Sequence, residues 1–309
     1  MLRTMGAANG GSGPRAVTLA DGRGIEFLVT GDGGADGGGL ALVVHEGTPS
    51  GLVLNAKVAG AAAERGLRVV QAARPGYEDS TPLPGRTVGD VIGDLAEVLD
   101  AAGVGDFVAV GFSGGGPHAL ASAALLPGRC LGAASVAGVA PYTAQGLDFL
   151  AGMGKENIEE FGAAARGAET LTAYLEEQLA ALSSITGEQI VAALGGLISA
   201  ADATVLTGEF ADDLARSLQG AVRNGIAGWR DDDLAFLADW GFPLGDLGGR
   251  VAIWQGDQDN MVPFAHGRWL AAHIPGARVH LEPGAGHLTM TVTAIDAILD
   301  DLLDLAGRR

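Results

Sequence analysis

Several residue types that would point to particular functions are scarce in this sequence. Cys130 is the only cysteine among 309 residues, which excludes an intramolecular disulfide and a multi-cysteine metal site. Basic residues are also few: 19 Lys and Arg stand against 37 Asp and Glu, and the net charge of −18 argues against nucleic acid and anionic membranes as partners. No apolar run approaches the roughly 20 residues of a membrane-spanning helix. The sequence therefore predicts a globular protein without nucleic-acid or membrane partners.

The N-terminal residues 1–15 also lack the features of a signal peptide. They are rich in glycine and alanine and contain no apolar segment of sufficient length. Cys130 lies in an apolar run and is expected to be a small core residue rather than a reactive thiol. We therefore expect a flexible tail over residues 1–15 and a cytoplasmic location. Nothing in the sequence indicates an oligomeric state.

What the sequence does contain is a regular alternation of short apolar runs with helical patterns. Two runs at 16–19 and 25–30, joined by a glycine-containing turn, predict an opening hairpin. Further strands are expected at 40–44, 67–72, 107–110, 130–137, 251–255 and 279–281, and helices at 52–65, 88–102, 117–126, 263–273 and 288–305. This alternation predicts an α/β fold with a mostly parallel sheet and helices on both faces.

The alternation stops for about a hundred residues, where helical patterns follow one another without a strand. Thr186 and Gln189 resemble a capping box ahead of a helix at 190–198, and another helical stripe covers 210–222. We interpret the whole stretch as an inserted helical cap. The predicted organisation is a core over 16–141 and 248–309, with the cap at 142–247.

Ser113 lies in the segment on which the functional prediction depends. It stands between glycines in Gly111-Phe-Ser-Gly-Gly115, after the strand predicted at 107–110 and before the helix predicted at 117–126. A chain that leaves a strand and enters a helix within so few residues forces the serine into a strained conformation. Its hydroxyl is then presented at a helix N-terminus, where backbone N–H groups stabilise negative charge. Ser113 is therefore predicted to be a nucleophile.

A serine nucleophile needs a base and a group that orients the base. Both are expected on loops at the carboxyl ends of later strands. We predict Asp259 as the orienting acid, with Asp257 as the alternative, because the longer spacing from Gly256 carries Asp259 past the strand end. His287 is predicted as the base, since it lies in a glycine-flanked loop, and the order Ser, Asp, His suits this architecture. The other histidines considered lie in regular segments and are expected to be packed or solvated: His118, His266, His273 and His280.

An acyl-transfer site also needs N–H donors for the developing oxyanion. One is expected from Gly114, directly after the nucleophile. The other is expected from the turn at residues 45–49, with Thr48 as the first choice and Gly47 as the reserve. The alternative interpretation of this turn is a tight entry into the next helix. No metal-ligand spacing and no phosphate-binding glycine loop occurs, so we expect no cofactor and no metal.

The sequence resembles the α/β-hydrolase superfamily, and within it the capped proline iminopeptidase-like and haloperoxidase-like serine hydrolases. The resemblance covers residues 40 to 305 and rests on Gly47-Thr-Pro49, Arg74-Pro-Gly-Tyr77, Gly111-Phe-Ser-Gly-Gly115 with Gly116-Pro-His118, Gly256-x-x-Asp259 with Val262-Pro263, and Gly286-His287. It implies the α/β-hydrolase fold and an acyl-enzyme mechanism in which Ser113 attacks, His287 transfers the proton and Asp259 orients His287. One position departs from the family pattern: Glu46 stands where the family usually has histidine before the Gly-x-Pro of the oxyanion turn.

The leading hypothesis is a serine hydrolase that cleaves a carboxylic ester, thioester, lactone or small amide, with a small molecule as substrate. The alternative, which Glu46 keeps open, is a non-hydrolytic ligand-binding protein, or a lyase or cyclase, on the same scaffold. An aminopeptidase would need cap acids to bind a substrate ammonium group, whereas charge on a cap helix usually faces solvent; the acids concerned are Glu159, Glu160 and Glu176. Large apolar cap residues are expected in the core more than in an acyl pocket: Phe149, Met153, Phe161, Trp229, Phe236 and Trp240.

Overall fold

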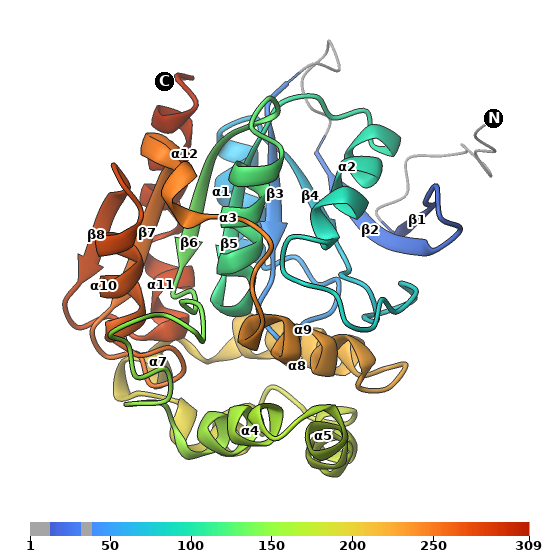
Figure 1. Ribbon diagram of the computed structural model, residues 1–309, viewed down its shortest axis with the longest axis vertical. Coiled ribbons are helices and arrows are strands. Elements are labelled where there is room, and N and C mark those ends of the chain that lie inside the picture. Colours follow the sequence, from blue (N-terminus) through green and yellow to red (C-terminus); the bar gives the residue numbers. More distant parts are fainter. Residues whose placement is uncertain (1–12, 32–38, 309) are drawn as a thin grey trace.

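The computed structural model describes residues 13–31 and 39–308, and its centre is an eight-stranded sheet (Figure 1). The strand order is β1-β2-β4-β3-β5-β6-β7-β8. The strands are β1 (Arg15–Thr18), β2 (Gly24–Thr30), β3 (Ala41–His45), β4 (Arg68–Ala72), β5 (Phe107–Phe112), β6 (Cys130–Val136), β7 (Val251–Gly256) and β8 (Arg278–Glu282). The pairs β1–β2 and β2–β4 are antiparallel, and all other pairs are parallel. The opening hairpin and the mostly parallel sheet predicted from the sequence are confirmed.

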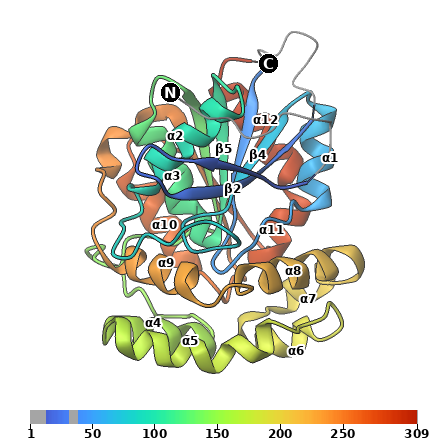
Figure 2. The ribbon, with the colours of Figure 1, turned by 90° about the vertical axis from the view of Figure 1, so that its right-hand side faces the viewer.

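Helices cover both faces of the sheet, because side chains of the central strands alternate between two hydrophobic cores (Figure 2). On β5, Phe107 and Ala109 point into one core, and Val108 and Val110 point into the other. The first core is covered by α2 (Val91–Ala101), α3 (Gly116–Leu125) and α10 (Phe264–His273), and the second by α1 (Ala56–Glu64), α11 (His287–Thr293) and α12 (Ile295–Leu305). Burial on both faces explains why β5 is apolar throughout.

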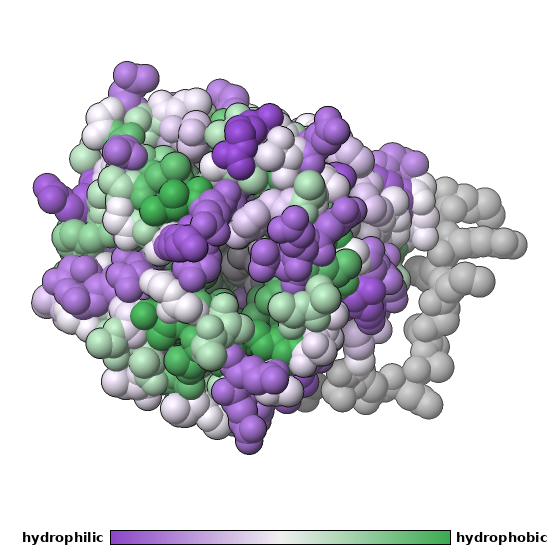
Figure 3. Space-filling model, turned by 90° about the horizontal axis from the view of Figure 1, so that it is seen from below, coloured by the Kyte–Doolittle hydropathy of each residue, from purple (hydrophilic) through white to green (hydrophobic). Residues whose placement is uncertain are grey.

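Between β6 and β7, the fully described residues 137–250 form helices and loops without a strand. We call helices α4 to α9 the helical layer: α4 (Lys155–Ala165), α5 (Ala168–Leu182), α6 (Ile190–Leu194), α7 (Ala200–Val205), α8 (Gly208–Ala221) and α9 (Ala227–Leu237). The layer lies below the sheet, with α8 and α9 nearer to the strands and α4 and α5 farther out (Figures 1 and 2). Seen from below, the surface mixes hydrophilic and hydrophobic residues (Figure 3).

Three helices differ most from their predicted bounds, while the others agree within about three residues. The single helix expected at 288–305 is divided at Ala294 into α11 and α12, because α12 packs its apolar face on the sheet while α11 is held at its N-terminus by the helical layer. The helix expected at 190–198 ends at Leu194, since Gly195 takes a φ of 51° and a short 3-10 turn follows. The first helix begins at Ala56 rather than at residue 52, because the side chain of Asn55 caps its N-terminus.

Predictions were also made for the N-terminal tail and for the single cysteine. Residues 1–12 of the expected tail lie outside the described residues, and Arg15 at its end already belongs to β1. Cys130 is buried on β6, and burial raises the pKa of its thiol to about 12, which suits a core residue. In the part of the chain that the structure describes, no helix combines the length and the apolar character needed to cross a bilayer.

Candidate active site

Ser113 lies at the carboxyl end of β5, in the turn that leads into α3. Its φ of 53° falls in the left-handed region, which a residue with a side chain adopts only under strain. The neighbouring glycines are needed for space: a Cβ at Gly115 would overlap the carbonyl of His45, and a Cβ at Gly111 would overlap the carbonyl of Gly115. The turn thus has the strained geometry expected from its sequence, and Ser113 lines a cavity.

His287 begins α11, and its ring contacts Asp259 from the loop after β7. Nδ1 of His287 lies 2.8 Å from Oδ2 of Asp259. The backbone N–H groups of Met261 and Val262 each donate to Oδ1 of Asp259 at 2.8 Å, and the side-chain amide of Gln255 donates to Oδ2 at 2.9 Å. The carboxylate is therefore fixed from three sides. When it accepts the Nδ1 proton of His287, Nε2 is left for another partner.

The pKa of His287 is raised above its ordinary value. Burial by itself would lower this pKa, but the charge of Asp259, its hydrogen bond to the ring and the charge of Asp202 outweigh burial. These two carboxylates stabilise the imidazolium form. A histidine with this environment suits the transfer of a proton near neutral pH.

The other residues considered for the same roles have different partners. Asp257 is exposed; it accepts hydrogen bonds from the backbone N–H of Gly284 and from the side chain of Gln258, and so braces the loops after β7 and β8. The remaining histidines pack against their neighbours: His118 on the carbonyl of Gly114, His266 on Ala140 and Phe149, His273 on Trp269, and His280 on Trp254 and Asp301. Among the histidines that the structure describes, His287 is the one hydrogen-bonded to Asp259.

Ser113 and His287 line the same cavity, which lies between the sheet and the helical layer and has a volume of about 300 Å³. Gly114 and residues 46–49 line it from the side of the sheet. The apolar wall comes from the helical layer and includes Phe161, Leu182, Leu214, Leu218, Trp229 and Phe236. The expectation that the large apolar residues belong to the core was therefore incomplete for Phe161, Trp229 and Phe236. They are buried and also face the cavity, because they lie on the inner side of α4 and α9.

The turn that carries Thr48 is held by Arg74, which follows β4. Arg74 donates to the carbonyl oxygens of Glu46 and Gly47 at 2.7 and 2.8 Å. It also pairs with Asp232 of α9 at 2.6 Å, and the hydroxyl of Thr48 donates to the same carboxylate at 2.7 Å. The shape of the turn thus depends on a carboxylate of the helical layer.

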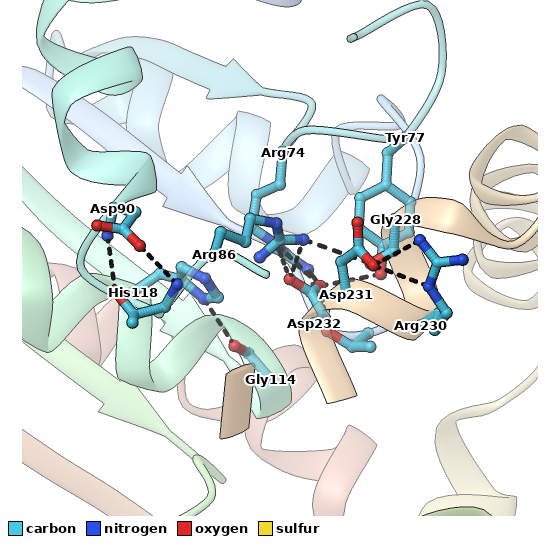
Figure 4. Close-up of polar contacts among 12 residues, drawn as sticks. Arg74, Tyr77, Arg86, Asp90, Gly114, His118, Gly228, Arg230, Asp231 and Asp232 are labelled. Atoms are coloured by element: carbon cyan, nitrogen blue, oxygen red, sulfur yellow. Dashed lines mark hydrogen bonds and ion pairs between the residues drawn. The ribbon is translucent and has the colours of Figure 1, made fainter. Parts of the chain in front are cut away.

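Asp232 is the centre of a buried ionic cluster (Figure 4). Arg86 pairs with it at 2.7 Å, and the hydroxyl of Tyr77 donates to it at 2.9 Å. Burial would raise the pKa of Asp232, but the charges of Arg74 and Arg86 outweigh burial and hold that pKa well below its usual range. Arg74 and Tyr77 are the two ends of the Arg-Pro-Gly-Tyr motif noted in the sequence, so the motif joins the sheet to the helical layer.

The sequence of this chain matches a known protein family. A family model described as alpha/beta hydrolase fold matches residues 41–292, from β3 to α11. The chain belongs to the α/β hydrolase family. The fold and the family resemblance expected from the sequence motifs are thereby confirmed. Among curated proteins, none matches this sequence significantly.

Solved structures of α/β hydrolases align with almost the whole chain, at identities that show the fold alone. A bromoperoxidase from Bacillus anthracis is 22% identical, with a TM-score of 0.66 over 94% of this chain and 100% of its own. The enol-lactonase from Burkholderia xenovorans LB400 is 18% identical, with a TM-score of 0.63 over 95% of this chain and 100% of its own. A thermophilic esterase from Thermogutta terrifontis is also 18% identical, with a TM-score of 0.63 over 95% and 99%.

Sequence reasoning missed a residue that holds the first turn of α11, where His287 lies, in this α/β hydrolase. Asp202, on α7 of the helical layer, is fully buried and accepts hydrogen bonds from the backbone N–H groups of His287, Leu288 and Thr289 at 3.0, 2.8 and 2.9 Å. These N–H groups form the first turn of α11, where a carboxylate is favourable. The sequence does not connect Asp202 with His287, because its partners on α11 lie 85 to 87 positions away. Its local partner is Ser199, whose hydroxyl donates to Asp202 at 2.9 Å.

The other polar groups of the cavity include five carboxyl groups beside several hydroxyl and amide groups. Glu46 lines the cavity, and burial raises its pKa to about 7 against the opposing charge of Arg74. A fraction of Glu46 is therefore protonated at neutral pH, unlike an ordinary glutamate. Within residues 13–31 and 39–308, no group of three or more His, Cys, Asp or Glu side chains is arranged to hold a metal ion.

Proposed function

We propose that this α/β hydrolase cleaves a carboxylic ester, thioester, lactone or small amide through an acyl-enzyme formed on Ser113. One observation carries the proposal: Ser113, in its strained turn, and His287, hydrogen-bonded to Asp259, line the same cavity. A serine hydroxyl is a weak nucleophile unless a base takes its proton. Because both residues line this cavity, a small molecule bound there suits attack by Ser113 with His287 as the base.

In the proposed reaction, Oγ of Ser113 attacks the carbonyl carbon while Nε2 of His287 takes the hydroxyl proton. Asp259 holds the Nδ1 proton of His287 and stabilises the imidazolium. The bond from the carbonyl carbon to the leaving group then breaks, and His287 gives its proton to the departing oxygen, sulfur or nitrogen. Water attacks the acyl-enzyme in the same way, and its proton passes through His287 to Ser113.

We assign the oxyanion donors to the backbone N–H groups of Gly114 and Thr48, with Gly47 as the reserve. Gly114 follows the nucleophile at the start of α3, where the first N–H groups are not used within the helix. The described residues provide no hydrogen-bond acceptor for the N–H of Thr48, whereas its hydroxyl is bound by Asp232. We further propose that residues 142–247 act as a cap that closes the cavity and selects the substrate.

Labelling with a fluorophosphonate probe at neutral pH tests this function, with intact-mass analysis of the adduct. We expect one adduct on the natural chain and none on Ser113→Ala. The matched control is Ser50→Ala, which removes another hydroxyl beside the cavity and is expected to leave the adduct in place. Turnover of an activated ester should fall by at least about 10⁴-fold in Ser113→Ala.

The absence of an adduct on the natural chain, in folded protein, would reject the acyl-enzyme. That result would direct attention to Glu46, which lines the cavity and has a pKa of about 7. That group favours a second candidate function, in which Glu46 transfers a proton in a lyase or cyclase reaction, or the scaffold binds a ligand without turnover. A product analysis that finds no added water would distinguish the lyase or cyclase from the hydrolase.

A further inference from the structure

Arg74 binds the backbone of the turn after β3 in a way that its ion pair does not require. Its side chain is buried and pairs with Asp232. In addition, Nη1 donates to the carbonyl oxygen of Glu46 at 2.7 Å, and Nη2 donates to the carbonyl oxygen of Gly47 at 2.8 Å. One guanidinium group therefore holds two successive peptide units of the turn that carries the assigned oxyanion donors.

The planarity of the peptide bond makes these contacts a constraint on N–H groups. In a trans peptide unit, the C=O and N–H bonds point in opposite directions, and both units are trans. The carbonyl of Glu46 shares its unit with the N–H of Gly47, and the carbonyl of Gly47 shares its unit with the N–H of Thr48. Because both carbonyls point at Arg74, both N–H groups point away from it.

The same turn lies against the nucleophile. A Cβ placed on Gly47 would lie 3.3 Å from Cβ of Ser113, and a Cβ placed on Gly114 would lie 2.5 Å from Oγ1 of Thr48. Residues 46–49 line the cavity, and the described residues provide no hydrogen-bond acceptor for the N–H groups of Gly47 and Thr48. These N–H groups are therefore available to an oxygen atom bound next to Ser113.

The side chain of Thr48 is engaged on the Arg74 side of the turn. Its hydroxyl accepts from Nη2 of Arg74 at 3.1 Å and donates to Asp232 at 2.7 Å. The backbone N–H is thus the donor that Thr48 has left for the cavity. A charged donor on the carbonyl of a peptide unit also polarises that unit, which makes its N–H a stronger donor.

Arg74 is itself held in one orientation by the buried ionic cluster (Figure 4). Asp232 accepts from Nε at 3.0 Å and from Nη2 at 2.6 Å, and the guanidinium lies 5.3 Å from the centre of the Tyr77 ring. Burial would lower the pKa of Arg74, but the charge of Asp232 outweighs burial and raises it. The guanidinium therefore keeps its charge, and a carboxylate of α9 fixes its direction.

We propose that Arg74 is a positioning residue of the reaction, which aims the N–H groups of Gly47 and Thr48 at the oxyanion. The proposal rests on the proposed function, in which attack by Ser113 creates that oxyanion. Arg74 is not one of the described residues that line the cavity, so it acts through the peptide units of the turn. The aimed N–H groups stabilise the negative oxygen of the transition state more than the carbonyl of the substrate. Loss of the guanidinium should therefore lower kcat and change KM little.

Arg74→Lys tests this role, because a single ammonium replaces the fork that spans two carbonyls and a carboxylate. With an activated ester, we expect kcat to fall at least about tenfold while KM stays within about threefold. The matched control is Arg86→Lys. Arg86 is buried and pairs with the same carboxylate, but it donates to the carbonyl of Gly228 and not to the turn. This control should also lose stability in urea, yet keep kcat within about threefold.

A second readout isolates the oxyanion from the other steps. With 1,1,1-trifluoro-2-octanone, the oxygen of Ser113 bonds to the carbonyl carbon, its proton passes to His287, and the carbonyl oxygen becomes an oxyanion. The matched probe 2-octanone has the same chain and remains a ketone. We expect the natural chain to bind the trifluoro ketone at least about 100-fold more tightly. This preference should fall at least about tenfold in Arg74→Lys and stay within about threefold in Arg86→Lys.

Two results would overturn the positioning role: a smaller fall of the preference in Arg74→Lys, or an equal fall in Arg86→Lys. The second result would mean that the loss follows from damage to the ionic cluster and not from the turn.

If Arg74→Lys fails to fold, the amide proton resonances of the natural chain decide the question. Those of Thr48 or Gly47 should move downfield when the trifluoro ketone binds, because they then donate to an oxyanion. The N–H of Gly51, which donates to Ser217, is the internal control and should not move. Unmoved resonances of both Thr48 and Gly47 would reject the role.

Failure of this role is distinguishable from failure of the proposed function. A fluorophosphonate adduct on Ser113, together with an unchanged ketone preference in Arg74→Lys, rejects only the positioning role. The absence of an adduct on the natural chain rejects the acyl-enzyme and with it the oxyanion that the role requires.

Discussion

Asp232 and Asp233 are neighbours on α9, and both are buried, yet their surroundings are opposite. Two arginines hold the pKa of Asp232 well below its usual range, while burial and the nearby Glu160 hold that of Asp233 well above it. Successive residues of a helix point about 100° apart, so Asp232 reaches the core and Asp233 reaches the cavity. The comparison teaches that burial alone does not assign a role to a carboxyl group. The groups around it decide whether it is an ion-paired carboxylate that joins parts of the fold, as Asp232 is, or a carboxyl that keeps a proton shared with a second acid, as Asp233 does with Glu160.

The largest expected effect is on stability. Asp232→Ala leaves Arg74 and Arg86 buried without their partner, which should lower the free energy of unfolding by about 3–5 kcal/mol. Urea denaturation measures the change, and Asp212→Ala, at an exposed site on α8, serves as the control. A loss below about 1 kcal/mol would mean that the cluster does not hold the layer to the core.

Asp202 extends the comparison to a carboxylate whose partners are backbone N–H groups. Asp202→Asn removes the charge and one acceptor from the first turn of α11, so His287 should be less well placed. We expect kcat/KM for an activated ester to fall by about 10- to 100-fold at neutral pH. Because the charge of Asp202 raises the pKa of His287, the rise of kcat/KM with pH should also move to lower pH. Asp212→Asn is the matched control, and an unchanged pH profile would leave Asp202 a structural role only.

Asp233→Asn should act in the opposite direction to Asp232→Ala. The native pKa of Asp233 is raised above its unfolded value, so its neutral form is favoured in the fold, and the wild-type protein loses stability as the pH rises from the unfolded pKa through the native one. The asparagine has no charge to lose, and the variant should be more stable by about 1 kcal/mol at neutral pH. Thermal unfolding at pH 4 and pH 8 checks this: the gain should be larger at pH 8. A variant less stable than wild type at both pH values would mean that the hydrogen bond between Asp233 and Glu160 outweighs the cost of burying the Asp233 charge.

The smallest effect is expected at Glu46. Above its pKa of about 7, Glu46 becomes charged near the turn that is assigned to the oxyanion, and should oppose the developing negative charge. Glu46→Gln should therefore raise kcat/KM a few-fold above pH 7 and change it little at pH 6. Glu64→Gln, an exposed acid on α1, provides the control. Superimposable pH profiles would show that the Glu46 charge does not reach the reacting atoms.

Local patterns predicted much of the fold and part of the site. The strands at 40–44 and 107–110 were found within one or two residues of β3 and β5, because continuous apolar runs are needed where both faces of a sheet are covered. The turn around Ser113 was also predictable, since its glycines are required within a few positions of the serine. By contrast, the break between α11 and α12 at Ala294 was not predicted. The apolar stripe in the sequence continues across it, and the two helices are separate because they pack against different parts of the molecule.

The sequence by itself determined the alternation of strands and helices, the strained turn at Ser113 and the loop that carries Asp259; His287, predicted in a loop, is the first residue of α11. Each of these depends on residues close together in the chain. Only the tertiary structure decided which acids contact the candidate site, since Asp202 meets His287 across 85 positions and Asp232 meets Arg74 across 158. In the sequence, Asp231-Asp232-Asp233 resembles a solvated run of charge. The direction in which each side chain leaves α9, and what lies there, follows from long-range packing that no local pattern contains.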